Sequence, residues 1–431
     1  MAATDAGRYE IAEQRLARAI EAWRELEDRT GAARATAAQG RVFLAAGNSR
    51  GAIALLDPAV GEFADLAGQP AGIALGGNLA RALYMSNDNR RAIEVADRVL
   101  AAAEHADVLE IVADTLVTRG TALAIEGRPI EGLGAIRAGR DLADAQGYGA
   151  TVVRADVNHV FVATLRDPRS GYEAAGTGIA YAQRLGIRQG MPILVGNLGE
   201  TGLRTGAWAA VLDEMDRFLA QDWEASDRVQ LMNSGSQIRA LRGEDMESRL
   251  AEMRQLIGDD HDPQLRAIVE NVAAYLAFVR GDLRAARSAW HRFVAYEVAQ
   301  IPIAIPQAAR AALWSGDAAA AREDLVTMED RGIHGPAIEA SRRTIRAGLV
   351  ALEGRPAEAH PLYRDALRSW RDLGLAWDEA LCGLDMAQLL DPSEPQVKAA
   401  AESSREILVR LGAAPFIARL DAALARSAAP A

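Results

Sequence analysis

Apolar side chains recur at helical spacing along most of the chain. In residues 131–145 (EGLGAIRAGRDLADA), Leu133, Ile136 and Ala143 fall on one side of a helix, whereas Asp141 falls on the other. No segment shows the sustained alternation, rich in Val, Ile and Thr, that would indicate a β-strand. The pattern therefore predicts an all-α chain.

Two stretches more than two hundred residues apart share an opening and a length. They are EGRPIEGLGAIRAGRDLADAQGY (126–148) and EGRPAEAHPLYRDALRSWRDLGL (353–375). Their opening turn recurs every 35 to 40 residues, at Gly7, Gly47, Asn87, Gly127, Arg166, Gly206, Gly243, Gly281, Gly316, Gly354 and Pro392. Such a period is typical of solenoids built from supersecondary units. We predict an α-solenoid of about eleven helix–turn–helix repeats with a period of about 40 residues.

Each repeat is predicted to contain a first helix (A), a tight turn and a second helix (B). The A helices are expected near 32–46, 71–86, 109–126, 149–165, 190–205, 227–242, 264–280, 305–315, 337–353 and 376–390. A small residue often follows the turn by five positions, as at Ala52, Ala92, Gly132, Ala286 and Ala359. Because a small side chain lets two helices approach closely, we expect these residues to be buried between A and B.

The repeat pattern predicts one superhelix over residues 1–431, with an incomplete first repeat. Residues 1–6 are too few to form an A helix before the first B helix. One face of that B helix should therefore lack a partner helix. Either the chain was cut from a longer protein or this face is a docking surface, and we favour the first explanation. At the other end, residues of about 413–427 should form a short helix that caps the last repeat.

Two prolines should disturb one repeat. Pro302 and Pro306 should delay the A helix at 305–315 and make residues 299–307 irregular, because proline lacks an N–H and disfavours helix at the preceding residue. Pro58 and Pro361 are expected inside B helices.

The repeat resembles the tetratricopeptide repeat in its longer bacterial form. Three stretches are similar to the C-terminal repeats of bacterial regulators with an AAA-type ATPase and a class III cyclase, or of LuxR-type ATPase regulators. These stretches are GNLGETGLRTGAWAAVL (196–212), SWRDLGLAWDEALCGLDMAQLL (369–390) and SSREILVRLGAAPFIARLDAAL (403–424). The resemblance implies a non-enzymatic regulatory or protein-interaction module, the C-terminal arm of a larger signalling or transcription-regulatory protein. Its expected partner is a protein segment or the catalytic module of the parent protein.

Composition narrows the expected chemistry. The formal charge is −11, with 48 Lys and Arg against 59 Asp and Glu, and no basic cluster indicates nucleic acid or a membrane as partner. Cys382 is the single cysteine, so no internal disulfide can form and a cytoplasmic location is expected. Lys398 is the single lysine and belongs to no P-loop. We expect no catalytic residues and no cofactor.

No metal site is expected either. Asp259, Asp260, His261 and Asp262 lie together in GDDHDP, but this stretch lacks the glycine and the distal glutamate of a calcium loop. We interpret it as a solvated loop between repeats.

Five of the eight asparagines fall within predicted A helices. They are Asn78, Asn158, Asn197, Asn233 and Asn271. Since asparagine is a poor helix former, its recurrence there needs a local reason. One explanation, which we favour, is a hydrogen bond from each amide to the backbone of a neighbouring repeat.

The alternative explanation is a binding site. If the A helices line a concave groove, asparagine amides in that groove could bind a peptide or a small ligand by hydrogen bonds. The candidate residues are Asn158, Asn197 and Asn233 with Arg154, His159 and Glu200. An alternative to the protein-interaction module is therefore a small-molecule sensor that binds a metabolite in the groove.

Overall fold

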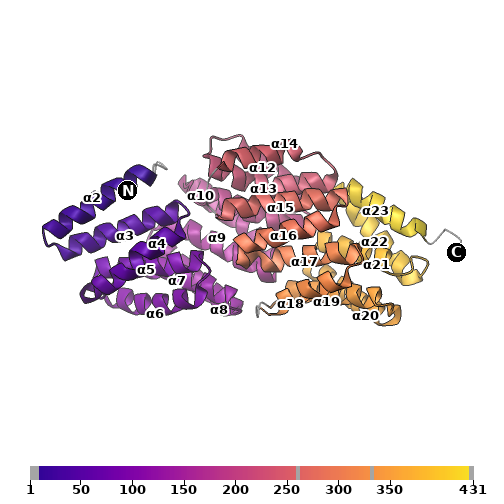
Figure 1. Ribbon diagram of the computed structural model, residues 1–431, viewed down its shortest axis with the longest axis horizontal. Helices are drawn as coiled ribbons and strands as arrows, with labels where there is room; N and C mark the ends of the chain where they lie inside the picture. Colours follow the sequence, from indigo (N-terminus) through magenta and orange to yellow (C-terminus); the bar gives the residue numbers. More distant parts are fainter. Residues whose placement is uncertain (1–8, 259–262, 331–333, 427–431) are drawn as a thin grey trace. The chain divides into compact units, whose positions relative to one another are not determined.

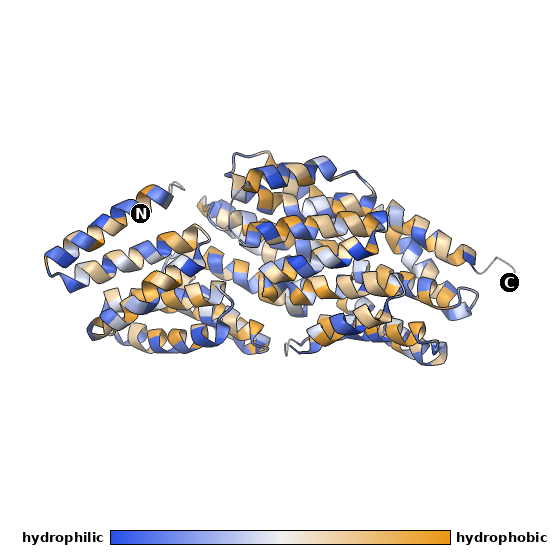
Figure 2. Cartoon of the chain, viewed as in Figure 1, coloured by the Kyte–Doolittle hydropathy of each residue, from blue (hydrophilic) through white to orange (hydrophobic). Residues whose placement is uncertain are grey.

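The computed structural model describes residues 9–258, 263–330 and 334–426. Within these residues the chain forms 22 α-helices and two short 3₁₀ helices, η1 (Ala64–Leu66) and η2 (Val298–Gln300), and no strand. Figure 1 shows the helices following one another as pairs, and apolar and polar positions alternate around them (Figure 2). The predicted all-α array of helix pairs is confirmed. The turn at Gly7 and the loop 259–262 lie outside the described residues.

The observed helices match the predicted A and B positions. The A helices are α3 (Arg29–Ala45), α5 (Pro70–Met85), α7 (Leu109–Ile125), α9 (Gly149–Arg166), α11 (Met191–Thr205), α13 (Ala225–Arg242), α15 (Pro263–Arg280), α17 (Ile301–Trp314), α19 (Pro336–Leu352) and α21 (Ala376–Leu389). The B helices are α2 (Tyr9–Glu25), α4 (Ser49–Glu62), α6 (Asn89–His105), α8 (Pro129–Ala145), α10 (Pro168–Leu185), α12 (Trp208–Leu219), α14 (Glu247–Ile257), α16 (Leu283–Tyr296), α18 (Ala318–Glu329), α20 (Pro356–Leu373) and α22 (Pro395–Leu411). The predicted cap is α23 (Ala414–Ala425).

The turns inside the repeats follow directly from the sequence. Left-handed backbone occurs at Gly47, Asn87, Gly127, Gly206, Gly243, Gly281, Gly316 and Gly354. Glycine reaches this region without steric cost and asparagine tolerates it, which ends these eight A helices. The predicted turns at Arg166 and Pro392 differ, because α9 and α21 end there without a left-handed residue. The next residue can then cap helix B, as Asn48 does by accepting the N–H of Gly51 at 2.8 Å. Asp88, Asp282 and Asp317 cap their B helices in the same way.

The small residues after the turns are buried, as predicted. Ala52, Ala92, Ala286 and Ala359 are 0% exposed. Gly132 lies so close to α7 that a Cβ atom would stand 2.4 Å from the carbonyl oxygen of Gly120. The contact between A and B helices therefore leaves no room for larger side chains.

One helix boundary differs from the prediction. α17 begins at Ile301, directly after η2, and not near residue 305. Pro302 stands in its first turn, where the missing N–H would be unpaired anyway, and Pro306 is accommodated inside the helix. Pro58 and Pro361 lie inside α4 and α20, as expected.

The chain divides into two compact units. Unit 1 consists of residues 1–162 with 184–187, and unit 2 of residues 163–183 with 188–431. Unit 1 has an aliphatic core in which α2 to α8 pack in sequence. Unit 2 has an aromatic core, in which the C-terminal helices contact helices far earlier in the sequence.

Candidate functional site

The predicted site residues are divided between the two units. Arg154, Asn158 and His159 lie on the part of α9 that belongs to unit 1. Asn197, Glu200 and Asn233 lie on α11 and α13 of unit 2. Each group is therefore a separate candidate.

In unit 1, Arg154 is held by the preceding A helix. Its guanidinium donates to the backbone oxygen and the carboxylate of Asp114, both at 2.9 Å, and to the hydroxyl of Thr118 at 2.7 Å. The side chain is mostly buried between α7 and α9. Because its hydrogen bonds join two repeats, Arg154 has a clear structural role.

The asparagine prediction is confirmed at Asn78. Its amide donates at 2.8 Å to the backbone oxygen of Ala37, one repeat earlier. Asn158 differs, because its amide donates at 2.8 Å to Arg154 of its own helix, and its oxygen accepts from Thr121 at 3.1 Å. The carbonyl equivalent to that of Ala37 is that of Val117, which accepts from the Thr121 hydroxyl at 2.8 Å. Asn158 meets the neighbouring repeat through this Thr121 side chain instead.

The surroundings of His159 favour its neutral form. Burial lowers the pKa of His159, and the nearby Arg137 and Arg140 lower it further. The imidazole is therefore neutral at physiological pH and contributes no charge to unit 1.

Arg81 is the charged residue that the sequence reasoning missed in unit 1. It lies on α5, one turn after Asn78, and forms no ion pair with the described residues. Burial lowers the pKa of Arg81 to about 10, and the nearby positive charge of Arg154 acts in the same direction. The sequence signal that could have identified Arg81 was its position one turn after Asn78 on the same predicted A helix.

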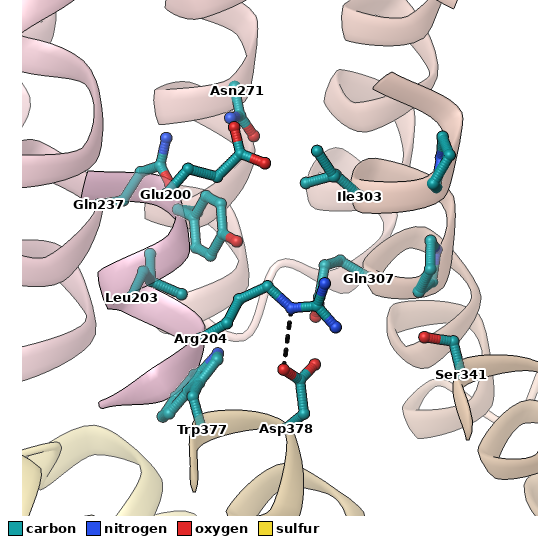
Figure 3. A pocket seen from close by; sticks show the side chains of 13 residues that line it. Glu200, Leu203, Arg204, Gln237, Asn271, Ile303, Gln307, Ser341, Trp377 and Asp378 are labelled. Carbon is teal, nitrogen blue, oxygen red and sulfur yellow. Dashed lines mark hydrogen bonds and ion pairs between the residues drawn. The ribbon is translucent and has the colours of Figure 1, made fainter. Parts of the chain in front are cut away.

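Unit 2 contains a small cavity among its A helices, lined by both polar and apolar side chains. Its lining includes Glu200 of α11, Gln237 of α13, Asn271 of α15, Gln307 of α17 and Asp378 of α21. The remaining lining residues are Leu203, Arg204, Tyr275, Pro302, Ile303, Pro306, Ser341 and Trp377. The cavity volume of about 20 Å³ holds about one water-sized group. Figure 3 shows the Glu200 carboxylate beside the Asn271 amide at this site.

Glu200 is the only predicted site residue in this lining, and its charge is poorly compensated. The Oε1 atom is buried with no hydrogen-bond partner. Burial raises the pKa of Glu200 to about 7, while Arg204 opposes the shift and Glu297 adds to it. Near neutral pH, the Glu200 carboxyl group can therefore gain or lose a proton, and its carboxylate form can bind a cation.

The other charges in this region are paired. Arg204 donates to Asp378 at 2.9 Å (Figure 3). Deeper in unit 2, Arg310 donates to both carboxylate oxygens of Asp385 at 3.1 Å, and the indole of Trp314 donates to the same carboxylate at 2.7 Å. These pairs connect α11 to α21 and α17 to α21. They attach α21, the last A helix, to the earlier A helices α11 and α17.

The cap helix is fixed to the same region by arginines. Arg419 of α23 donates to the backbone oxygen of Phe278 at 3.3 Å, and its guanidinium lies 4.9 Å from the ring centroid of Trp314. Arg242 of α13 donates to the backbone oxygen of Leu411 at 3.0 Å. The C-terminal helices therefore pack onto the earlier helices of unit 2.

The remaining asparagines differ from one another. The Asn233 oxygen accepts from Gln237 of its own helix at 2.6 Å and does not reach another repeat through this bond. Asn271 is buried and faces the cavity. Neither Asn197 nor Asn233 lines the cavity, so the predicted groove residues are not brought together.

The described residues contain neither a candidate membrane span nor a candidate metal cluster. In the part of the chain that the structure covers, no helix is long and apolar enough to cross a membrane. Nor do the described residues include a group of three or more His, Cys, Asp or Glu side chains that could hold a metal ion.

Comparison with known proteins yields structural likeness only. No family model and no curated protein matches the chain. Yeast Tom70 is 10% identical, with 92% of this chain and 96% of that chain covered and a TM-score of 0.32. The P58(IPK) TPR domain is 15% identical, with 86% and 96% covered and a TM-score of 0.23. A circular tandem repeat protein with a novel repeat topology is 13% identical, with 98% and 96% covered and a TM-score of 0.17. At such TM-scores the chain paths differ, so the fold rests on the helix pairs described above.

Proposed function

We propose that the chain is a protein-interaction scaffold and that the A helices of unit 1 bind an acidic protein segment. The observation that carries this proposal is Arg81, whose half-buried guanidinium forms no ion pair with the described residues. A buried charge without a partner is costly, and a carboxylate from another protein would offset that cost. Arginine suits this role because its planar guanidinium can donate two parallel hydrogen bonds to one carboxylate.

The surroundings of Arg81 support an anionic partner. Arg154 lies close enough to lower the pKa of Arg81, so it adds positive charge to this part of α5 and α9. Asp114 is occupied by Arg154 at 2.9 Å and does not form an ion pair with Arg81. The neighbourhood therefore carries a local positive charge on a chain with a formal charge of −11.

A direct binding measurement tests this proposal. A fluorescein-labelled hexaglutamate peptide should raise its fluorescence anisotropy on addition of the protein, and added salt should weaken the binding. Arg81→Gln should weaken it at least about tenfold, equivalent to about 1.4 kcal/mol. Because this change removes an unpaired buried charge, the variant should keep its thermal stability.

Arg98→Gln is the matched control. Arg98 is exposed on the neighbouring helix α6, so the substitution removes the same charge from the surface without touching Arg81. Its binding should stay within about twofold of the wild type. Equal losses in the two variants would mean that overall charge, and not Arg81, attracts the peptide.

We further propose that the scaffold is the non-enzymatic regulatory arm of a larger bacterial signalling or transcription-regulatory protein. The resemblance of residues 196–212, 369–390 and 403–424 to the C-terminal repeats of such regulators supports this. The test is to sequence the DNA on both sides of the segment that encodes this chain, and to co-purify this chain with any ATPase or cyclase domain encoded there. Failure of such a domain to bind this chain would contradict the regulatory arm but leave the acidic-segment proposal intact.

A further inference from the structure

The interior of unit 2 contains a carboxylate, that of Glu200, which forms no ion pair with the described residues. Arg204 is committed to Asp378, and Arg310 is committed to Asp385. These four side chains are almost completely buried, with 1 to 12% of each exposed. Glu200 lies in the same region, and its Oε1 atom has no hydrogen-bond partner. The unprotonated form of Glu200 therefore places an uncompensated negative charge inside the unit.

The cavity beside Glu200 is lined by further acceptor groups. Asn271 offers an amide oxygen beside the Glu200 carboxylate (Figure 3). Gln237 uses its Nε2 atom to donate to Asn233 at 2.6 Å, which leaves its oxygen as an acceptor. Tyr275 and Trp377 add aromatic rings to the lining, and aromatic faces attract cations. The lining thus combines negative charge, acceptors and aromatic surface.

We propose that this cavity is a binding site for a small ammonium group, carried by a free primary amine or by the tip of a lysine side chain. An –NH₃⁺ group has three donors, which the Glu200 carboxylate and the Asn271 and Gln237 oxygens can accept. Its charge would balance that of the Glu200 carboxylate. The volume of about 20 Å³ admits one group of this size and is too small for a quaternary ammonium. The site lies in unit 2 and does not depend on the acidic-segment proposal, which concerns unit 1.

A proton is the competing occupant. The charged groups around Glu200 are Arg204 on the same helix, Asp378 on α21 and Glu297 just before η2, with Tyr275 on α15. Protonation would neutralise Glu200 without any ligand. The site must therefore be tested at a pH about one unit above the pKa of Glu200, where the carboxylate is charged.

Thermal unfolding in different salts separates the two occupants. Methylammonium chloride should raise the melting temperature in a saturable way, by about 2 °C or more at ten times its dissociation constant. Tetramethylammonium chloride and sodium chloride at equal ionic strength should not do so, because the first cation exceeds the cavity and the second donates no hydrogen bonds. An equal response to all three salts would show only an ionic-strength effect and overturn the proposal.

Two glutamate variants locate the effect. Glu200→Gln should abolish the methylammonium response, and it should fold well because a neutral amide replaces a buried charge. Glu402→Gln, on the exposed side of α22, should keep the full response. A rise in melting temperature with methylammonium that persists in Glu200→Gln would contradict a binding site at Glu200.

n-Butylammonium chloride distinguishes the two sources of the ammonium group, since it carries the ammonium of lysine on a four-carbon chain. A shift equal to that of methylammonium would indicate that a lysine tip can enter the cavity. A shift with methylammonium alone would indicate a free small amine. Absence of both shifts would contradict the proposal.

Discussion

Units 1 and 2 use the same helix–turn–helix repeat but build different interiors. In unit 1 the A and B helices meet through small residues such as Ala52, Ala92 and Gly132. Hydrogen bonds such as that from Asn78 to Ala37 join one A helix to the next. In unit 2, Trp208 and Trp377 contact each other at 5.1 Å between ring centroids, although they are far apart in the sequence. The repeat therefore determines the local pairing of helices but not what their inner surfaces contact.

The charges without an ion pair also differ between the two units. Among the described residues, unit 1 leaves the guanidinium of Arg81 without an ion pair, whereas unit 2 leaves the carboxylate of Glu200 without one. Two ion pairs of unit 2 attach α21 to α11 and α17, and the Arg419 guanidinium, which has no carboxylate partner in the described part of the chain, is held by the backbone of Phe278 and the ring of Trp314. Arg81 and Glu200 lack such compensation, so a ligand of opposite charge would be stabilised most at these two places.

The largest expected effect concerns the buried ion pair of unit 2. Arg310→Leu should leave the Asp385 carboxylate buried with only the Trp314 indole as a described donor, and lower the free energy of unfolding by about 3 to 5 kcal/mol. Urea denaturation measures the loss. Arg310→Leu/Asp385→Leu should recover much of it, because it removes both charges.

Arg322→Leu is the control for this pair. Arg322 contacts Glu353 at 2.8 Å, but its side chain is 54% exposed. The substitution should change the free energy of unfolding by about 1 kcal/mol or less. A loss as large as that in Arg310→Leu would mean that burial of the pair does not decide its contribution.

The next largest effect should be shared by the two units. Ala92→Leu in unit 1 and Ala286→Leu in unit 2 should each overpack the contact between A and B helices and cost about 1 to 3 kcal/mol, measured by urea denaturation. Ala101→Leu, on the exposed side of α6, should change stability by about 0.5 kcal/mol or less. Similar losses at all three sites would contradict the assigned turns.

A smaller effect should distinguish the asparagines. Asn78→Ala should remove the bond to Ala37 and lower the free energy of unfolding by about 1 kcal/mol. Asn233→Ala should cost less, because its recorded bond reaches only Gln237 on the same helix. Melting curves of the two variants test this order, and an equal or larger loss at Asn233 would contradict a role of Asn78 in joining repeats.

The sequence predicted local structure well because the signals for it are local. A glycine or asparagine turn followed by a capping residue, as at Gly47 and Asn48, ends one helix and begins the next within three residues. Pro302 misled the prediction of α17 because a proline is also compatible with the first turn of a helix. Element types and most boundaries were therefore predictable from the sequence.

The candidate sites were less predictable because they depend on contacts between distant repeats. A repeat period predicts which residues of neighbouring repeats meet, as for Asn78 and Ala37. It gives no indication that Arg204 pairs with Asp378, which is 174 residues away. Without that contact, nothing in the sequence distinguishes Glu200 from the other helical glutamates.

The last expected effect is the pH dependence that Glu200 gives to unit 2. Burial raises the pKa of Glu200 from 4.5 to about 7 in the folded chain. Between these values the folded state retains a proton that the unfolded state has lost, so the free energy of unfolding should fall as pH rises from about 4.5 to 7 and then level off. Glu200→Gln has no carboxyl group to titrate. Relative to the wild type, its free energy of unfolding should therefore increase over this window by up to about 3 kcal/mol, since one pKa unit corresponds to about 1.4 kcal/mol. Urea midpoints across the window, in buffers without primary amines, measure this difference. Wild-type and Glu200→Gln curves that stay parallel would contradict this expectation. They would show that the Glu200 carboxylate is solvated in the folded protein and that its charge does not destabilise unit 2.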